Sequence, residues 1–326
     1  MSIQSGVVDF PVIEQERAPL AAQWRAIMRC PACGSDGFVA RSGLPDRYCM
    51  FGSERIVYPE EGIAIVECND CGLYYKSAVP APAFLAELYR RHAQAKWSTA
   101  HDFAPEAGLL RRLRGSARFD LLDVGAADGT FLAACGSAGI TGRRSAFDVM
   151  PYAGIGQHLS GELMEGFLDG PLPAWSREPY DVVTLFDVIE HFYEPAVAFE
   201  NLRSLLRAGG LILIETGNSA SFWPRRAGID RWWYVRLLEH HVFWSRRSLG
   251  RIAGAHGFRI VHWREVRHKS RRGLPQREVA IDLVKTGLYV LTGPHYARIA
   301  GWFGREGNQP WCPFGRDHFE ACLEEA

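Results

Sequence analysis

The sequence predicts an α/β fold, with a doubly wound and mainly parallel sheet that follows a small N-terminal metal-binding module. Strand-like and helix-like segments alternate over residues 106–265, which is typical of a parallel sheet with helical crossovers. A glycine turn joins the first of these strands to its helix, and two Cys-x-x-Cys-Gly motifs lie upstream.

Two cysteine pairs define the N-terminal module, which we place at residues 29–76 after a lead-in at residues 1–28. Strand-like segments at residues 54–58 and 62–66 lie between the pairs, which are Cys30 with Cys33 and Cys68 with Cys71. Two such turns can aim four thiolates at one point, as in a tetrahedral zinc site. We therefore expect a zinc ribbon with structural Zn²⁺. Disulfides and a redox pair are the alternatives, and neither suits two Cys-x-x-Cys turns in an intracellular chain.

A linker region follows at residues 77–105. Pro80 and Pro82 interrupt it, and a helix is expected near residues 83–92. The α/β core then begins at about residue 106.

The glycine turn lies in the segment Leu121-Leu-Asp-Val-Gly-Ala-Ala-Asp-Gly-Thr130. Gly125 and Gly129 allow positive φ and a close approach to a ligand, and the N–H groups that open the next helix can meet an anion such as a carboxylate. Asp148 ends the next hydrophobic segment, at the spacing from which an acidic side chain reaches a ribose diol. We therefore expect the adenosyl end of a cofactor here.

The remaining motifs decide between cofactors. The turn lacks a third small residue for packing over a pyrophosphate, and the carboxylate of Asp128 would repel phosphates. Residues 180–187 read as a buried strand that ends at Asp187, followed by Glu190-His191 and a helix from about Pro195. Residues 206–216 read as a helix end, a Gly-Gly turn and another buried strand.

These motifs, together with Glu239-His240-His241 and the Phe243-Trp-Ser245 that follows, resemble class I S-adenosylmethionine-dependent methyltransferases of the type 11/23 branch. The resemblance covers about residues 119–261. It implies a Rossmann-like sheet in a methyltransferase domain at residues 106–265, and a linker region that lies over the cofactor as a helical lid. The metal-binding module joined to such a core is similar to bacterial methyltransferases of small-molecule and sugar pathways.

The resemblance also implies roles for individual residues around S-adenosylmethionine. Asp187 is expected near the sulfonium, and either Phe167 or Asp169 at the adenine, whereas Leu168 is expected in the core. The full set expected to bind the cofactor is Asp123, Gly125, Gly129, Asp148, Phe167, Asp169 and Asp187. An ordinary strand-to-helix turn is the alternative for the two glycines.

Methyl transfer to a hydroxyl or an acidic carbon needs a proton acceptor, a role that suits histidine. His240 is the first candidate because it matches the family's Glu-His position, and His191 is the second. His241 can replace His240 if the turn differs by one residue, and Glu190 orients its neighbours. Each histidine can instead be a purely structural residue.

The acceptor is expected to be a small molecule, such as a sugar or another biosynthetic intermediate. Aromatic and arginine side chains at residues 222–234 suit a flat, sugar-like or phosphorylated ligand. Of the 326 residues, 47% are hydrophobic, which is enough for a full core. Their net charge is zero, which argues against nucleic acid as a partner. Without a membrane span or signal sequence, a cytoplasmic location is expected. RNA methylation and cofactor binding without catalysis remain alternatives, and a short helical extension is expected at residues 266–326.

Overall fold

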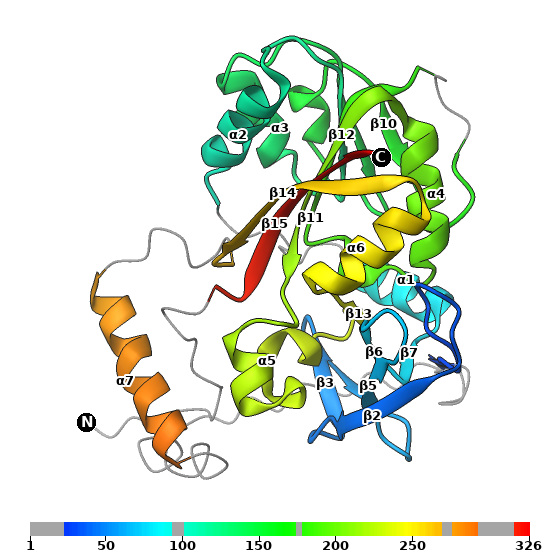
Figure 1. Cartoon of the computed structure of the whole chain (residues 1–326), viewed down its shortest axis with the longest axis vertical. Helices are drawn as coiled ribbons and strands as arrows, with labels where there is room; N and C mark the ends of the chain where they lie inside the picture. Colours follow the sequence, from blue (N-terminus) through cyan, green and yellow to red (C-terminus); the bar gives the residue numbers. More distant parts are fainter. Residues whose placement is uncertain (1–22, 93–100, 174–177, 269–275, 293–315) are drawn as a thin grey trace.

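The computed structural model describes residues 23–92, 101–173, 178–268, 276–292 and 316–326. Its centre is a seven-stranded sheet in the order β10-β9-β8-β11-β12-β15-β14 (Figure 1). The first five strands are parallel, whereas β15 runs antiparallel between β12 and β14. Their bounds are β8 (Leu121–Val124), β9 (Arg144–Asp148), β10 (Leu163–Glu165), β11 (Tyr180–Phe186), β12 (Leu206–Gly217), β14 (Phe258–Val266) and β15 (His318–Glu325). The α/β fold predicted from the sequence is confirmed.

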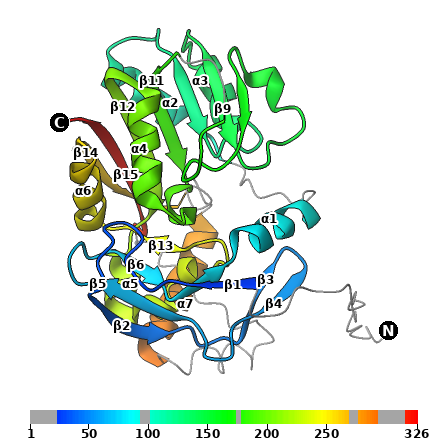
Figure 2. The same ribbon diagram turned by 90° about the vertical axis from the view of Figure 1, so that its right-hand side faces the viewer.

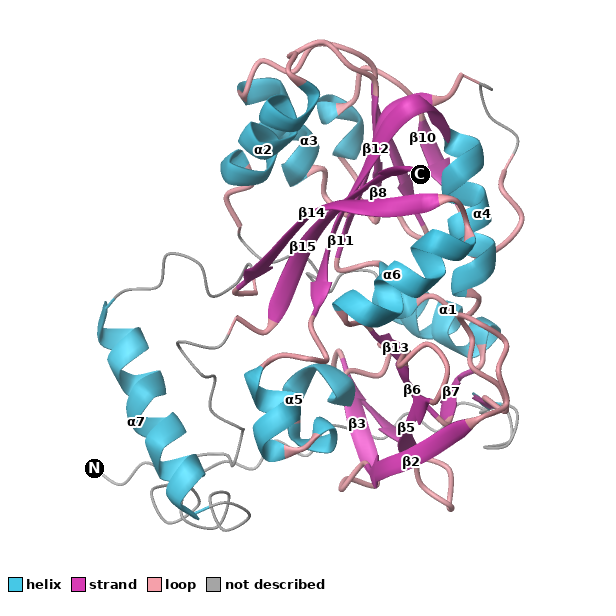
Figure 3. Cartoon of the chain, viewed as in Figure 1, coloured by secondary structure: helices cyan, strands magenta, loops and turns pink. Residues whose placement is uncertain are grey.

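Helices cover both faces of this sheet (Figure 3). Leu213 packs in the apolar cluster with α2 (Ala104–Arg114) and α3 (Thr130–Ser137). Its neighbours Ile212 and Ile214 pack in the other cluster, with α4 (Pro195–Leu205) and α6 (Arg246–Ala255). Because both faces are buried, β8 and β11 are mostly apolar and show no alternation of apolar and polar residues.

The C-terminal segment differs from the expectation of a short helical extension after residue 265. The helix is present as α7 (Gln276–Thr292), but residues 318–325 form β15 inside the large sheet. This strand pairs with β12 on one side and β14 on the other, and its residues from His318 to Cys322 are buried. The end of the chain is therefore part of the core.

The N-terminal module is built on a small sheet with the order β13-β6-β5-β2. Three of its strands belong to the module, but β13 (Val242–Phe243) comes from the segment that follows Glu239-His240-His241. The others are β2 (Phe38–Gly43), β5 (Ala64–Cys68) and β6 (Tyr74–Lys76), beside the hairpin of β3 (Tyr48–Phe51) with β4 (Glu54–Val57) and the pair β1 (Trp24–Ala26) with β7 (Ala78–Pro80). Both strands expected between the cysteine pairs are therefore present.

Between the small strands and the large sheet lies α1 (Pro82–Arg91), as Figure 2 shows. The remaining short helices are η2 (Ile155–His158), η3 (Ile189–His191), α5 (Phe222–Ala227), η4 (Ile229–Arg231) and η5 (Trp233–Arg236). Over the described ranges, no helix has both the length and the apolar character needed to cross a membrane.

Candidate functional site

A cavity of about 400 Å³ lies at the carboxyl ends of β8, β9 and β11, where open α/β sheets bind ligands. Leu85 and Tyr89 of α1 also line it, so the helix of the linker region contributes to the cavity wall. The expected site residues that line it are Asp123, Gly125, Asp148, Phe167, Asp169, Asp187, His191 and His240. Gly129 and Glu190 lie behind this lining.

The turn after β8 depends on its glycines. Gly125 and Gly129 adopt φ values of 70° and 77°, which L side chains rarely adopt. A Cβ on Gly125 would also come within 2.4 Å of the Val188 Cγ2 atom. Ala127 has a φ of 46° without being glycine, and such backbone strain is typical of ligand sites.

The carboxylate of Asp148 is held in one orientation at the end of β9. Its Oδ2 atom accepts a hydrogen bond from the Ala127 amide, and its Oδ1 atom accepts one from the Met150 amide, both at 2.8 Å. Each carboxylate oxygen has a second lone pair. The side chain therefore lines the cavity as a fixed acceptor.

The turn also contains an unexpected cap. The Asp128 Oδ1 atom accepts hydrogen bonds from the Thr130 amide at 3.1 Å and from the Thr130 hydroxyl at 2.6 Å. The first N–H of α3 is therefore already used, although the sequence suggested that it would meet a ligand. A carboxylate in this place disfavours a pyrophosphate, as expected.

Asp123 is buried in β8, where its Oδ1 atom accepts a hydrogen bond of 2.7 Å from the Thr184 hydroxyl. This bond links β8 to the neighbouring strand β11 at the floor of the cavity.

The two residues expected near an adenine differ in what they contact. Phe167 lines the cavity with 39% of its surface exposed, so an aromatic face is accessible to a ligand. The Asp169 Oδ2 atom accepts hydrogen bonds from the Tyr193 and Glu194 amides, just before α4. Leu168 is buried in the core, as expected, although it also reaches the cavity wall.

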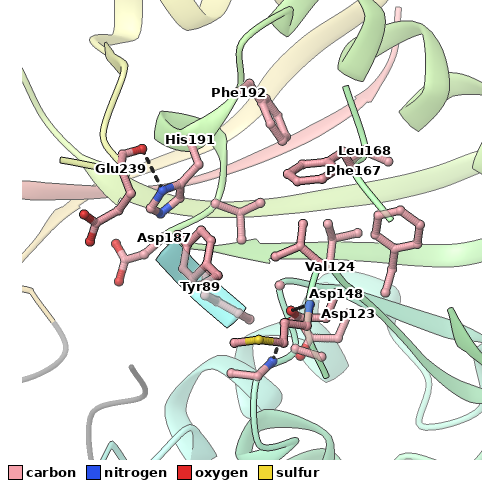
Figure 4. Close-up of a pocket in the computed structure, with 18 of the residues that line it drawn as sticks. Tyr89, Asp123, Val124, Asp148, Phe167, Leu168, Asp187, His191, Phe192 and Glu239 are labelled. Carbon is pink, nitrogen blue, oxygen red and sulfur yellow. Dashed lines mark hydrogen bonds between the residues drawn. The ribbon is translucent and has the colours of Figure 1, made fainter. Parts of the chain in front are cut away.

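His191 lies at the opposite end of the cavity from Asp148 (Figure 4). Its Nδ1 atom is 2.9 Å from the Glu239 carbonyl oxygen. A carbonyl only accepts hydrogen bonds, so Nδ1 must carry the proton, and in the neutral ring Nε2 keeps a free lone pair. The side chain is 29% exposed, so this imidazole can exchange a proton with a ligand in the cavity.

Glu190 is completely buried and holds the surrounding side chains together. Its two oxygens accept hydrogen bonds from the hydroxyls of Tyr234 at 2.5 Å and Thr216 at 2.7 Å. The Nε2 atoms of His191 and His240 lie 3.7 and 3.9 Å from its Oε1 atom. Burial raises the pKa of the Glu190 carboxyl above its ordinary value.

His240 reaches the cavity wall but is only 4% exposed. Its ring packs against those of Tyr234 and His191, with centroid distances of 4.0 and 4.8 Å. Burial, and secondarily the positive charge of protonated His191, lower the pKa of His240 well below its ordinary value. His241 is turned away from the cavity, and its ring contacts Tyr193 at 4.2 Å.

The aromatic side chains of residues 222–234 also differ in whether they reach the cavity. Trp233 and Tyr234 line the cavity, whereas Trp223 and Trp232 do not and pack behind them in the buried cluster that also includes Tyr234. The arginines of residues 225–226 are exposed, and no arginine or lysine is found among the described residues that line the cavity. The structure therefore gives no support for the expected phosphate contacts.

Three residues near the cavity were not predicted from the sequence: His268, His318 and Asp317. The Nε2 atom of His268, which lines the cavity, and the Nε2 atom of His318 each lie 3.5 Å from the carboxylate of Asp187. Asp317, next to His318 in the chain, accepts a hydrogen bond of 3.1 Å from the Trp233 indole. No local motif marks these residues, because the position of β15 between β12 and β14 depends on long-range pairing.

The four cysteines of the N-terminal module converge. The Sγ atoms of Cys30 and Cys71 are 3.6 Å apart, those of Cys33 and Cys68 are 3.5 Å apart, and all four lie within 4.8 Å of one another. Bonds of about 2.3 Å to one tetrahedral zinc ion would place sulfur atoms about 3.8 Å apart. The donor set and spacing therefore fit the expected ion.

Comparisons with known proteins agree with this geometry. A family model described as a methyltransferase domain matches residues 89–263, a range that begins within α1, includes β8 to β12 and ends within β14. No curated protein matches the chain significantly.

Among solved structures, the [4+2]-cyclase SpnF superposes with a TM-score of 0.50 and 16% identity, over 76% of this chain and 97% of the other. A TehB-like S-adenosylmethionine-dependent methyltransferase from Corynebacterium glutamicum gives 0.41 and 16%, over 76% and 100%. The 1,6-didemethyltoxoflavin N1-methyltransferase from Burkholderia thailandensis gives 0.43 and 17%, over 64% and 89%. At these identities the likeness concerns the fold alone.

Proposed function

Because this chain belongs to the methyltransferase domain family, and is a class I S-adenosylmethionine-dependent methyltransferase, we propose that it methylates a small molecule in the cavity described above. The observation that carries the proposal is that one cavity holds a fixed carboxylate, Asp148, at one end and a histidine with a free lone pair, His191, at the other. The cofactor supplies an activated methyl group on sulfur when it is bound.

The end of the cavity at β8 and β9 suits the cofactor. Asp148 would accept hydrogen bonds from the ribose hydroxyls through its remaining lone pairs. Phe167 would pack on the adenine, and we prefer it to Asp169, whose carboxylate already accepts the two amides before α4. Asp123 and the Gly125 to Gly129 turn would face the methionine part.

The other end supplies a proton acceptor. We infer that His191 is the general base, because the Glu239 carbonyl fixes its tautomer and its side chain is open to the cavity. Its location at one end of the cavity lets it take a proton from an acceptor hydroxyl or acidic carbon as the methyl group arrives. This ranking reverses the order suggested by the family motif, which placed His240 first.

His240 and Glu190 would then hold the imidazole of His191 in place and stabilise its protonated form. The His240 ring is nearly inaccessible, and burial favours its neutral form. Glu190 is held by Tyr234 and Thr216, and its charge lies close enough to stabilise a protonated His191. Both residues are therefore proposed to position and stabilise the base.

The lining indicates the kind of acceptor. Trp233 and Tyr234, which packs on His240, line this end of the cavity, together with the carboxylates of Asp187 and Glu239. Unless a cation is bound there, an anionic group would meet these charges without a described arginine or lysine to balance them. We propose an uncharged, hydroxylated acceptor such as a sugar or another biosynthetic intermediate.

We also propose that Cys30, Cys33, Cys68 and Cys71 hold one structural Zn²⁺. Four thiolates leave no open position for water, so the ion would stabilise the module and take no part in the chemistry. Among the described residues every cysteine is free of disulfide bonds, which supports the expected reducing, cytoplasmic compartment.

Two measurements test this function. Calorimetry with S-adenosylhomocysteine should show one binding site per chain. Incubation with a trideuteromethyl-labelled cofactor and a panel of hydroxylated small molecules should give a labelled product by mass spectrometry. Cofactor binding without any product would favour a binding protein without catalysis, and labelled RNA with strongly salt-dependent binding would favour the RNA alternative.

A further inference from the structure

Asp187, His268 and His318 form a separate cluster at the wall of the cavity, from three distant parts of the chain. Asp187 follows β11, His268 lies just after β14, and His318 is the first residue of β15. The imidazole Nε2 atom of His268 is 3.5 Å from the Asp187 Oδ2 atom, and that of His318 is 3.5 Å from Oδ1. The methyl-transfer proposal above gives no role to the two histidines.

His318 is held rigidly with one nitrogen directed at this cluster. Its Nδ1 atom lies 3.1 Å from the Asp317 Oδ1 atom. The Asp317 carboxylate is itself fixed by the Trp233 indole at 3.1 Å and the His268 amide at 3.3 Å. A carboxylate behind one imidazole nitrogen is the usual support of a histidine that binds metal through the other.

The second nitrogen of His318 has no hydrogen-bond partner within the described part of the chain. The residue is completely buried, and its Nε2 atom makes no hydrogen bond there. A buried polar atom without a partner costs about 1–3 kcal/mol. A ligand between His318 and Asp187 would remove that cost.

The distances suit a metal ion better than direct hydrogen bonds. Each separation of 3.5 Å exceeds a normal N–H···O bond. Two ligand atoms bound at about 2.0–2.1 Å to one tetrahedral ion lie about 3.4 Å apart. This value matches the 3.5 Å between each imidazole nitrogen and the Asp187 oxygen that it faces, Oδ2 for His268 and Oδ1 for His318. The three ligand atoms also lie within 4.8 Å of one another.

Backbone geometry adds an independent observation. Asp187 has a φ of 55° although it is not glycine, and strain of this kind is kept where the surrounding structure enforces it, commonly at functional sites. This conformation places the Asp187 carboxylate between the two imidazoles. An ordinary extended backbone at the end of β11 would not need a positive φ at Asp187.

We propose that Asp187, His268 and His318 bind one divalent transition-metal ion, such as Zn²⁺ or Fe²⁺. Two imidazoles and one carboxylate form a donor set that binds these ions in preference to Mg²⁺ or Ca²⁺. Because Asp187 and His268 line the cavity, the remaining coordination position faces the cavity. An oxygen of the acceptor would occupy it, a consequence that rests on the proposed function.

The neighbouring group of Glu190, His191 and His240 is a weaker candidate, although its ligand atoms are also close together. Both Glu190 oxygens already accept short hydrogen bonds, from Tyr234 and Thr216. The Nδ1 atom of His191 is used by the Glu239 carbonyl. An ion there would have to displace two short hydrogen bonds, whereas the Tyr234 hydroxyl donates to the Asp187 Oδ1 atom at the longer distance of 3.3 Å.

A proton is the alternative occupant of the Asp187 cluster. In the metal-free protein, the carboxylates of Asp317 and Asp187 outweigh burial and raise the pKa of His318 to about 10. A charged imidazole between two carboxylates would then hold the cluster together without any ion. A measurement of metal binding distinguishes a cluster that holds a metal ion from one that holds only a proton.

The test measures metal on the full-length protein without cofactor or acceptor, so its outcome is independent of methyl transfer. The metal content of the purified protein is determined first, and Zn²⁺ and Co²⁺ are then titrated into it. We expect one ion beyond the four-cysteine site, with cobalt absorption that lacks the charge-transfer band of thiolate ligands. If the native protein binds no such ion, the proposal is wrong, whatever the variants do.

Variants locate the ion. His268→Gln, at the cavity wall, should weaken binding at least about tenfold. The matched control is His262→Gln on β14, whose Nε2 atom pairs with Glu320 at 3.1 Å outside the cluster, and it should bind metal as the native protein does. Metal affinity that is unchanged by His268→Gln, or is lost instead in His240→Ala, would overturn the assignment.

Discussion

The backbone amide of Lys76 donates a hydrogen bond of 3.0 Å to the carbonyl oxygen of His241. This bond joins the last strand of the cysteine module to the segment that carries His240. Next to it, β13 pairs with β6, and the Lys76 ammonium donates to the Leu237 carbonyl at 2.5 Å. The amide of His241 in turn donates to the Glu190 carbonyl at 2.8 Å. The cysteine module is thus part of the framework that holds the acceptor end of the cavity.

Removal of one cysteine ligand should therefore affect both the metal and the catalytic end of the cavity. We expect Cys33→Ser to lose the zinc of the module and to lower the free energy of unfolding by at least about 2 kcal/mol. Hydrogen exchange should speed up at residues 237–243 as well as in the module. Elemental analysis and exchange mass spectrometry measure these effects.

Cys49→Ser is the matched control, since Cys49 lies outside the group of four converging cysteines. It should keep the full zinc content. A folded Cys33→Ser protein with native zinc content would contradict a structural ion, and unchanged exchange at residues 237–243 would contradict the coupling.

The turn after β8 and the position of Asp148 at the end of β9 could be predicted from the sequence because local signals specify them. Gly125 needs positive φ within its own turn, and Asp148 ends a strand at a fixed spacing from it. The four converging cysteines are likewise visible in the sequence as two short turns. Each of these features depends on residues that are close in the chain.

The acceptor end could not be predicted in the same way. His268 and His318 reach Asp187 only because β15 inserts antiparallel between β12 and β14. The order of His191 and His240 depends on which ring is exposed, and that follows from packing against Tyr234 and from the Glu239 carbonyl. Long-range pairing and burial of this kind leave no local pattern.

Asp148 provides a test of the cofactor end. Asp148→Ala removes the proposed acceptor of the ribose hydrogen bonds, so it should weaken S-adenosylhomocysteine binding by about 1.5–3 kcal/mol. Asp169→Asn is the contrasting variant, because Asp169 accepts the amides before α4. It should lower thermal stability and leave cofactor affinity nearly unchanged. Calorimetry that finds native affinity in Asp148→Ala would exclude the proposed ribose contact.

His191 and His240 can be ranked by turnover once an acceptor is found. His191→Gln keeps a side-chain donor for the Glu239 carbonyl but cannot act as the base, so turnover should fall about 10²- to 10⁴-fold with cofactor affinity intact. His240→Ala should lower stability together with turnover, because it removes a buried ring beside Tyr234. His256→Gln, outside the cavity lining, is the control. Native turnover in His191→Gln would show that another group takes the proton.

Lys76 provides a pH test of the connection between the module and the core. Lys76 is 2% exposed, and burial lowers the pKa of its ammonium group from 10.5 to about 8, although the nearby charges of Cys49 and Glu239 act in the opposite direction. The unfolded chain therefore binds more protons between pH 8 and pH 10.5 than the folded protein does. The contribution of Lys76 to the free energy of unfolding should rise across this window, by about 3 kcal/mol in total.

Urea unfolding of the native protein and of Lys76→Met measures this contribution, because the other titrating groups are common to both. The free energy of unfolding of the native protein relative to the variant should be constant below pH 7.5 and should increase towards pH 10.5. Arg25→Met, at an exposed ion pair with Glu194, is the control and should give a constant difference. If the Lys76→Met difference were also constant, the folded protein would hold Lys76 with an ordinary pKa, and its ammonium would not be desolvated between the module and the Leu237 carbonyl.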